Sequence, residues 1–237
     1  MNSPEDSPHL PALDVRKAIR GYRAGELPYD GMLRALAEAP ALISIGSNNC
    51  GELLEATRSV IGGRWHDLYT SLSRCPGEVK ILVDGAGTLR SLAPEALGVT
   101  IDRGSPDEYL FIGPYTTHLE AWGRYVHLER GLAGRSVWGP QALLLSAEWT
   151  LLLELQKGAV QAARHEGRLV VCTAPDTVAA AVDLGAKLGR RWMPCKVRSA
   201  FLGALLAGEQ DVVFNPAGPR GPYVEPTELS EALRQAR

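Results

Sequence analysis

Hydrophobic residues recur at helical spacing in two segments near the start of the chain. Val15, Ile19 and Tyr22 lie on one face of a first predicted helix, which Gly25 ends. A second apolar stripe follows and stops before Pro40, since proline cannot continue a helix. The pattern therefore predicts two consecutive helices ahead of the first strand.

Beyond Pro40, short apolar runs bounded by turn residues alternate with helical stripes. The strands that we predict cover residues 41–45, 79–83, 99–101, 109–112, 169–172 and 211–214. The predicted helices cover residues 52–61, 92–97, 198–207 and 227–235, with one more after a capping box that begins at Thr173. The glycines of residues 113–140 are expected to break any long helix there. This alternation predicts an α/β or α+β protein, with small mixed sheets flanked by helices.

The same pattern suggests how the chain is divided. Residues 1–12 are rich in serine, proline and acids and are expected to be a flexible N-terminus. We predict one αβ module over residues 13–135 and a second over residues 136–237. The segment VTIDRGSP at 99–106 echoes VVFNPAGP at 212–219, which suggests two related modules. Residues 41–140 are therefore either a diverged repeat or an insertion.

Composition and charge narrow the class of protein. Of the 237 residues, 45% are hydrophobic and 22% charged, which is ordinary for a globular chain, and the net charge of −2 argues against nucleic-acid binding. The N-terminus lacks the features of a signal peptide, and no apolar run could span a bilayer. The cysteines are far apart in sequence and predict free thiols in a reducing, cytoplasmic compartment: Cys50, Cys75, Cys172 and Cys195.

Three segments of the last third resemble the SseB family of bacterial proteins: Gly167–Asp176, Asp211–Gly218 and Val224–Leu233. The front segments Gly21–Asp30 and Leu36–Pro40 look like the helical lead-in of that family. The resemblance covers roughly half of the chain. Ala217 and Gly218 replace the usual Gly-Ser, and Cys172 replaces a common aromatic residue.

The resemblance implies a binding role and supplies no catalytic residues. The SseB family is associated with serine sensitivity, with secretion-linked loci and with toxin immunity. It therefore implies a protein partner, such as an acidic surface of an effector or toxin.

Several polar groups suggest chemistry, but each lacks part of the motif that the chemistry needs. Gly85-Ala-Gly87 would need a third glycine to be a dinucleotide fingerprint, and position 90 is arginine. His66 and Asp67 are adjacent and would point apart on a helix, which favours a surface pair. His118 and His127 are too far apart in sequence to share a metal ion on one helix face. Gly134-Arg-Ser136-Val-Trp138 lacks the final glycine of a nucleophile elbow. We therefore expect no catalytic residues, no metal and no cofactor.

A basic stretch is the most promising binding feature of the sequence. It contains no acid between its cations, and a tryptophan lies within it. Arginine and tryptophan are enriched where interfaces bind most strongly. The predicted partner-binding residues are Arg190, Arg191, Trp192, Lys196 and Arg198.

A second aromatic group, Trp122, Tyr125 and Trp138, predicts either core packing or an exposed platform. We therefore expect a non-catalytic, SseB-like protein-binding module, such as an immunity or secretion-linked regulatory protein. Two alternatives stay open. One is an enzyme that binds phosphate at Gly85 and uses His66 or His118 as a base. The other is a structural protein that forms homo-oligomers through the aromatic residues.

Overall fold

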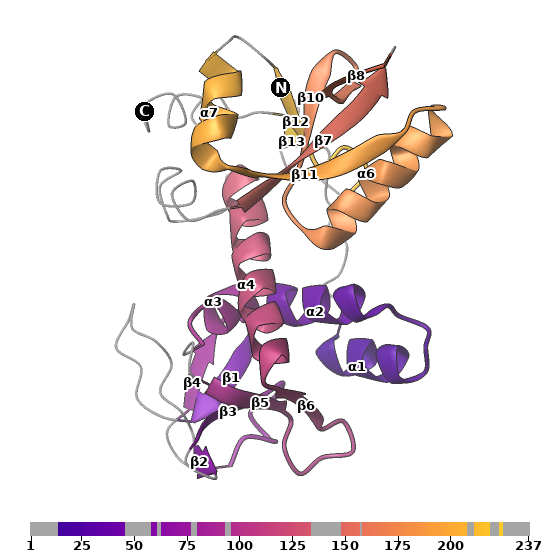
Figure 1. Cartoon of the computed structure of the whole chain (residues 1–237). Coiled ribbons are helices and arrows are strands. Elements are labelled where there is room, and N and C mark those ends of the chain that lie inside the picture. The colour runs from indigo at the N-terminus through magenta and orange to yellow at the C-terminus, as the bar shows by residue number, and fades with distance from the viewer. Residues whose placement is uncertain are drawn as a thin grey trace, which may run out of the picture. The chain divides into compact units, whose positions relative to one another are not determined.

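The computed structural model describes residues 14–45, 58–60, 63–76, 80–92, 96–133, 148–156, 158–207, 211–218 and 223–224. The chain divides into two compact units, Met1–Gly123 (unit 1) and Arg124–Arg237 (unit 2). Each unit combines helices with one mixed sheet, so the fold is α+β, as predicted (Figure 1).

Unit 1 starts with a helical pair and continues into its sheet. Asp14 caps the first helix, because its carboxylate accepts the N–H of Arg16 at 2.9 Å. The helices and strands are α1 (Val15–Arg23), α2 (Tyr29–Glu38), β1 (Leu42–Ile45), β2 (Arg58–Val60), β3 (Gly63–Tyr69), β4 (Lys80–Val83), α3 (Gly85–Arg90), β5 (Ala96–Ile101) and β6 (Tyr109–Ile112). Helix α4 (Pro114–Leu132) begins in unit 1 and ends in unit 2.

Unit 2 has a longer sheet and a helix on each side of it. Its elements after α4 are β7 (Glu148–Gln156), β8 (Ala159–Ala162), β9 (Arg164–His165), β10 (Arg168–Cys172), α6 (Pro175–Lys187), β11 (Trp192–Arg198), α7 (Ser199–Ala207), β12 (Val212–Phe214) and β13 (Tyr223–Val224). Side chains of β10 alternate between two apolar clusters. Leu169 and Val171 pack with Leu202 of α7, whereas Val170 and Cys172 pack with Ala181 of α6.

The two sheets have the same topology. The strand order is β4-β1-β3-β5-β6 in unit 1 and β11-β7-β10-β12-β13 in unit 2. In both sheets the central pair, β3 with β5 or β10 with β12, is parallel. The other pairs along each order are antiparallel.

The described parts of the echoing segments, 99–106 and 212–218, occupy equivalent positions in these sheets. Each runs along the second strand of the parallel pair and then enters the left-handed region, with φ of 51° at both Asp102 and Asn215. The side chain of each accepts the backbone N–H of a threonine, Thr70 at 2.8 Å and Thr173 at 3.0 Å. Asparagine and aspartate tolerate this backbone conformation better than other non-glycine residues.

Three local predictions were wrong. Residues 58–60 form strand β2, and residues 96–97 begin strand β5 rather than ending a helix. Helix α4 also continues through Gly123, where a side chain is excluded because a Cβ would lie 2.6 Å from the backbone nitrogen of Arg90. Close packing between α3 and α4 thus explains a glycine that the sequence suggested as a helix break.

The cap of α6 also differs from the prediction. Ala174, not Thr173, is the N-cap residue, and the Thr177 hydroxyl donates to the Ala174 carbonyl at 2.8 Å. The predicted helix over residues 227–235 lies outside the described residues, as does most of that over 52–61. Among the helices described, none is long and apolar enough to cross a membrane.

Candidate functional site

The predicted basic residues lie on and just before β11, an edge strand of unit 2. Acids of the neighbouring strand β7 reduce the charge that the sequence suggested. Arg190 lies 3.9 Å from the carboxylate of Glu154, and Lys196 lies 3.9 Å from that of Glu148. A stretch that reads as purely basic along the chain is therefore partly neutralised across the sheet.

Trp192 does not belong to the exposed surface. Its side chain is 3% exposed and packs in the apolar cluster beneath α6. Gly185 leaves the space for the ring, since a Cβ there would lie 2.7 Å from it. The ring therefore cannot be a first contact for a partner, and its predicted binding role does not fit its burial. Binding by Arg190, Arg191, Lys196 and Arg198 stays a prediction.

The Gly85 turn leads into a helix of six residues that the Asp84 carboxylate caps through the N–H of Gly87 at 3.0 Å. An acid already occupies the position that a phosphate would need. A Cβ at Gly85 would lie 2.2 Å from the Leu36 carbonyl, so close packing explains this glycine.

The histidine predictions have mixed outcomes. His66 and Asp67 lie buried on strand β3 rather than on the surface of a helix, so that prediction was wrong. His118 and His127 both lie on α4, and His118 is exposed. Across the described part of the chain, no group of three or more histidine, cysteine or acidic side chains could hold a metal ion.

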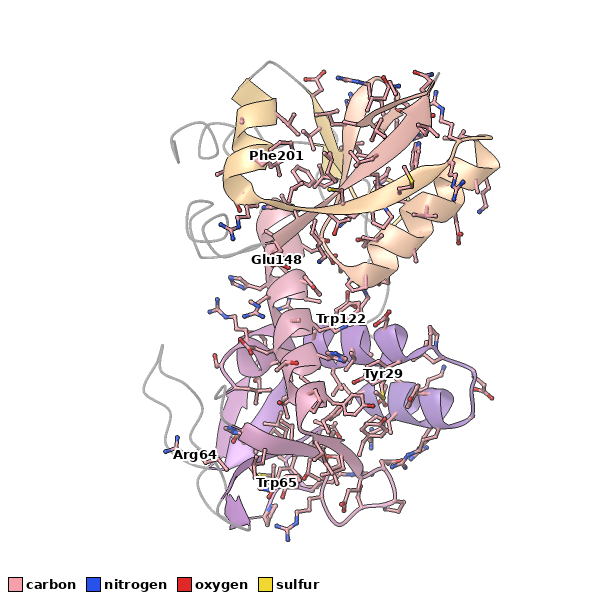
Figure 2. All side chains as sticks on the ribbon, in the orientation of Figure 1. Tyr29, Arg64, Trp65, Trp122, Glu148 and Phe201 are labelled. Carbon is pink, nitrogen blue, oxygen red and sulfur yellow. The ribbon has the colours of Figure 1, made fainter. Side chains whose placement is uncertain are left out.

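The remaining candidates are outside the described residues or packed. Ser136 and Trp138 belong to residues 134–147, which the structure does not describe. Trp122 is buried on α4, and the guanidinium of Arg34 lies 5.2 Å from its ring (Figure 2). Trp122 therefore packs in the core of unit 1.

A pocket of about 330 Å³ in unit 1 gathers aromatic side chains that the sequence analysis did not bring together. Its lining comes from the end of α1, the start of α2, strand β6 and the start of α4, and consists of Tyr22, Tyr29, Tyr109, Leu110, Phe111 and Tyr115. Figure 2 labels Tyr29, which comes from the start of α2. The centroid of the Tyr29 ring lies 5.6 Å from that of Tyr22, in a tilted contact, and 6.3 Å from that of Tyr115, in an edge contact.

Ion pairs fix α1 beside the loop that precedes β6. The guanidinium of Arg20 donates to both carboxylate oxygens of Asp107, at 2.6 and 3.0 Å. Arg74 bridges the same carboxylate and that of Asp102, at 3.1 and 2.9 Å. These hydrogen bonds, first that from Arg20, hold the pKa of Asp107 at about 2, although burial opposes them. The network thereby places Tyr22 against Tyr109.

Tyr29 has its hydroxyl buried behind the pocket surface. The hydroxyl has no hydrogen-bond partner among the described residues. Burial, together with the neighbouring tyrosines, raises the pKa of Tyr29 well above its ordinary value. The phenol therefore stays protonated at neutral pH and cannot act as a base.

Strand β6 lies at the edge of its sheet and borders the pocket. The N–H of Gly113 donates to the Leu97 carbonyl at 3.0 Å, and bonded residues alternate along an antiparallel pair. Tyr109 and Phe111 therefore bond to β5, and the backbone groups of Leu110 and Ile112 point to the outer edge. No described strand pairs with that edge.

The pocket could not be inferred from the sequence because its tyrosines come from four elements. Residues 22, 29, 109 and 115 form no motif, and tertiary packing brings Tyr22 to Tyr109 and Tyr29 to Tyr115. The one available signal was that Tyr22, Tyr29 and Tyr109 lie at the ends of predicted elements.

Comparisons with protein-family models, with curated proteins and with solved structures each return no match for this chain.

Proposed function

We propose that this protein acts by binding a protein partner, without catalysing a reaction on it, and that the tyrosine pocket of unit 1 is the contact site. The observation that carries the proposal is the grouping of four tyrosines around a pocket at an exposed sheet edge. Tyrosine provides a large, rigid contact area together with a hydroxyl, which is why it is enriched in binding interfaces.

The surroundings of the pocket support a partner larger than a metabolite. Tyr115, Leu110 and Ile112 are 54%, 44% and 51% exposed. Large apolar side chains grouped at an exposed edge are typical of protein contact surfaces. The SseB resemblance also implies a binding role, and it is consistent with this proposal without identifying the partner.

The test uses a library of random peptides displayed on phage and selected on the full chain. We expect selected peptides to bind about tenfold or more weakly to Tyr115→Ala, because exposed aromatic residues at the centre of an interface contribute most of the affinity. Phe201→Ala is the matched control, since Phe201 on α7 of unit 2 is 51% exposed. The affinity of the selected peptides for Phe201→Ala should equal that for the unmodified chain.

Two outcomes would overturn the proposal. One is a selection that enriches no peptide, and the other is peptides that bind equally to Tyr115→Ala. The double variant Arg190→Glu/Arg191→Glu tests the basic residues of unit 2. If this variant alone abolishes binding, the contact surface lies on β11 and not at the tyrosine pocket.

A further inference from the structure

We infer that the partner contributes an extended segment that pairs with strand β6 as an additional strand, and that this segment carries an aromatic residue and an acidic residue on the same face. The inference rests on the proposed function, because it specifies how the same site would hold its partner.

The backbone of β6 provides the first argument. The N–H and C=O groups of Leu110 and Ile112 point to the outer edge, where no strand of the described residues meets them. Such groups are a template for another strand, and peptide recognition by strand addition uses them. An extended peptide can satisfy both donors and both acceptors at once, which a small apolar molecule cannot.

The pocket lies against the same strand. Its lining includes three consecutive residues of β6, Tyr109, Leu110 and Phe111. Side chains alternate along a strand, so Tyr109 and Phe111 share the face next to the pocket and Leu110 points to the opposite face. A segment paired with the outer edge of β6 would therefore lie beside the pocket.

An added strand would use both faces of β6. Its side chains would also alternate, so that residues of one parity enter the tyrosine pocket and those of the other cover the exposed side chains of Leu110 and Ile112. The tilted rings of the pocket favour an aromatic residue at the first parity.

Arg23 is the reason to expect an acidic residue in the bound segment. Its guanidinium lies 5.7 Å from the centre of the Tyr109 ring and donates to the backbone carbonyls of Pro106 and Glu108. Within the described residues it has no carboxylate partner, so its charge is not neutralised at the edge of the pocket. A carboxylate on the bound segment would complement that charge.

The decisive experiment needs no variant of the protein. The tightest peptide from the phage selection is synthesised in a series in which each backbone amide in turn is N-methylated, and its affinity for the full chain is measured by calorimetry. Strand pairing predicts that methylation of alternate amides weakens binding about tenfold each, since each loses a backbone hydrogen bond, while the amides between them change affinity by less than about twofold.

The charge is tested separately with Arg23→Gln. We expect affinity to fall about threefold to tenfold, and its dependence on salt to become weaker. Lys187→Gln, at an exposed lysine at the end of α6 in unit 2, is the matched control and should leave both unchanged. The inference that the segment carries an acidic residue would be overturned if the selected peptides contain no acid, or if Arg23→Gln leaves their affinity unchanged.

Two further outcomes separate this inference from the proposed function. If methylation has no alternating effect but Tyr115→Ala still weakens binding, strand pairing is wrong and the pocket remains the contact site. If the free chain forms a dimer by light scattering, and Leu110→Lys dissociates it, the edge is filled by a second copy. That result would overturn the inference of a partner segment.

Discussion

The two units share one sheet topology, but the polar residue that follows the second parallel strand is an acid in unit 1 and an amide in unit 2. In unit 1, the residue after the parallel strand is Asp102, and its buried carboxylate accepts hydrogen bonds from Thr70 and Arg74. In unit 2 the equivalent residue is Asn215, whose amide donates to Thr173 at 2.9 Å. The hydroxyl of Thr173 then donates to the buried carboxylate of Glu129 at 2.7 Å.

This difference shows that the backbone fixes the size of the side chain at this position, whereas the neighbouring side chains decide whether it is charged. The left-handed turn and the threonine N–H require a short side chain with an oxygen acceptor at this position in both units. Whether that side chain carries a charge depends on the nearby group, which is a guanidinium in unit 1 and a carboxylate in unit 2. An acid fits the first and an amide fits the second, because like charges cannot both be ionised when buried together.

The edges of the two sheets differ as well. Strand β11 of unit 2 carries Pro194, Lys196 and Arg198, and proline and charged residues protect an edge against pairing. Strand β6 of unit 1 has the sequence Tyr-Leu-Phe-Ile and contains neither. One edge is thus protected, whereas the other is open to the pairing that we infer.

The largest effect is expected when Asn215 of unit 2 is replaced by aspartate, the residue type found at the equivalent position in unit 1. Asn215→Asp puts a second carboxylate beside Glu129, whose Oε1 lies 3.5 Å from the Asn215 amide nitrogen. We expect a loss of about 3 kcal/mol in the free energy of unfolding at neutral pH, as for other unpaired buried charges. Hydrogen exchange of the β10 and β12 amides would report unit 2 separately.

The loss should depend on pH in a defined direction. Repulsion raises the pKa of one carboxylate in the folded variant, so protonation relieves it and the loss becomes smaller as the pH falls toward 5. The control is Ala217→Asp, which adds the same charge at an exposed position two residues away. A loss that grows on acidification would contradict this account.

The reverse exchange, Asp102→Asn, should have a smaller effect. The amide keeps an acceptor for the Thr70 N–H and tolerates the left-handed backbone. Its NH2 group replaces the oxygen that accepts from the Thr70 hydroxyl and from Arg74, although Arg74 keeps its second partner, Asp107. We expect a loss of about 2 kcal/mol in the free energy of unfolding, because two hydrogen bonds to that oxygen are lost and one of them is charge-assisted. Urea unfolding would measure it. If Asp102→Asn loses more stability than Asn215→Asp, the charge of the neighbouring group does not decide which residue type fits each position.

Asp107→Asn tests the ion pairs that hold α1 beside β6. The folded pKa of Asp107 is about 2, below the ordinary value of 3.8, so its stabilisation is present above about pH 4 and is lost as the pH falls toward 2. The variant should therefore show a flatter decrease in unfolding free energy between pH 4 and pH 2, as measured by acid titration at fixed urea. Asp183→Asn on α6 is the exposed control, and an identical slope in the Asp107→Asn variant would exclude this role.

The smallest effect is expected at the tyrosine pocket. Tyr29→Phe removes a buried hydroxyl without a partner and should raise the free energy of unfolding by up to about 1 kcal/mol. Tyr115→Phe is the matched contrast, because Tyr115 is 54% exposed. That variant should leave stability unchanged. If Tyr29→Phe is destabilising in thermal unfolding, the Tyr29 hydroxyl stabilises the folded chain.

The sequence predicted the secondary structure best where local rules decide it. The predicted first helix and the strand at 109–112 agree with α1 and β6. The predicted strand at 169–172 and helix at 198–207 agree with β10 and α7 to within one residue. Predictions were wrong where packing overrides local preference, as at Gly123, whose missing side chain lets α3 approach α4 closely. The Thr173 hydroxyl was likewise predicted to cap a helix, but it bonds to Glu129, a residue 44 positions earlier.

The candidate site was not predictable from the sequence. The basic residues near Arg190 are adjacent in the chain and were therefore visible, yet Glu148 and Glu154 partly neutralise them from the neighbouring strand. The tyrosines of the pocket are far apart in the chain, so no spacing rule could assemble them.

The sequence by itself determined the α+β class, most of the described helices, six of the thirteen described strands, and the short polar residue that follows the second parallel strand of each unit. These depend on hydrophobic periodicity and on backbone preference between near neighbours. The tertiary structure decided which side chains are buried, which charges are neutralised and where four tyrosines meet beside an open strand edge. Those properties depend on contacts between residues far apart along the chain, and only folding creates such contacts.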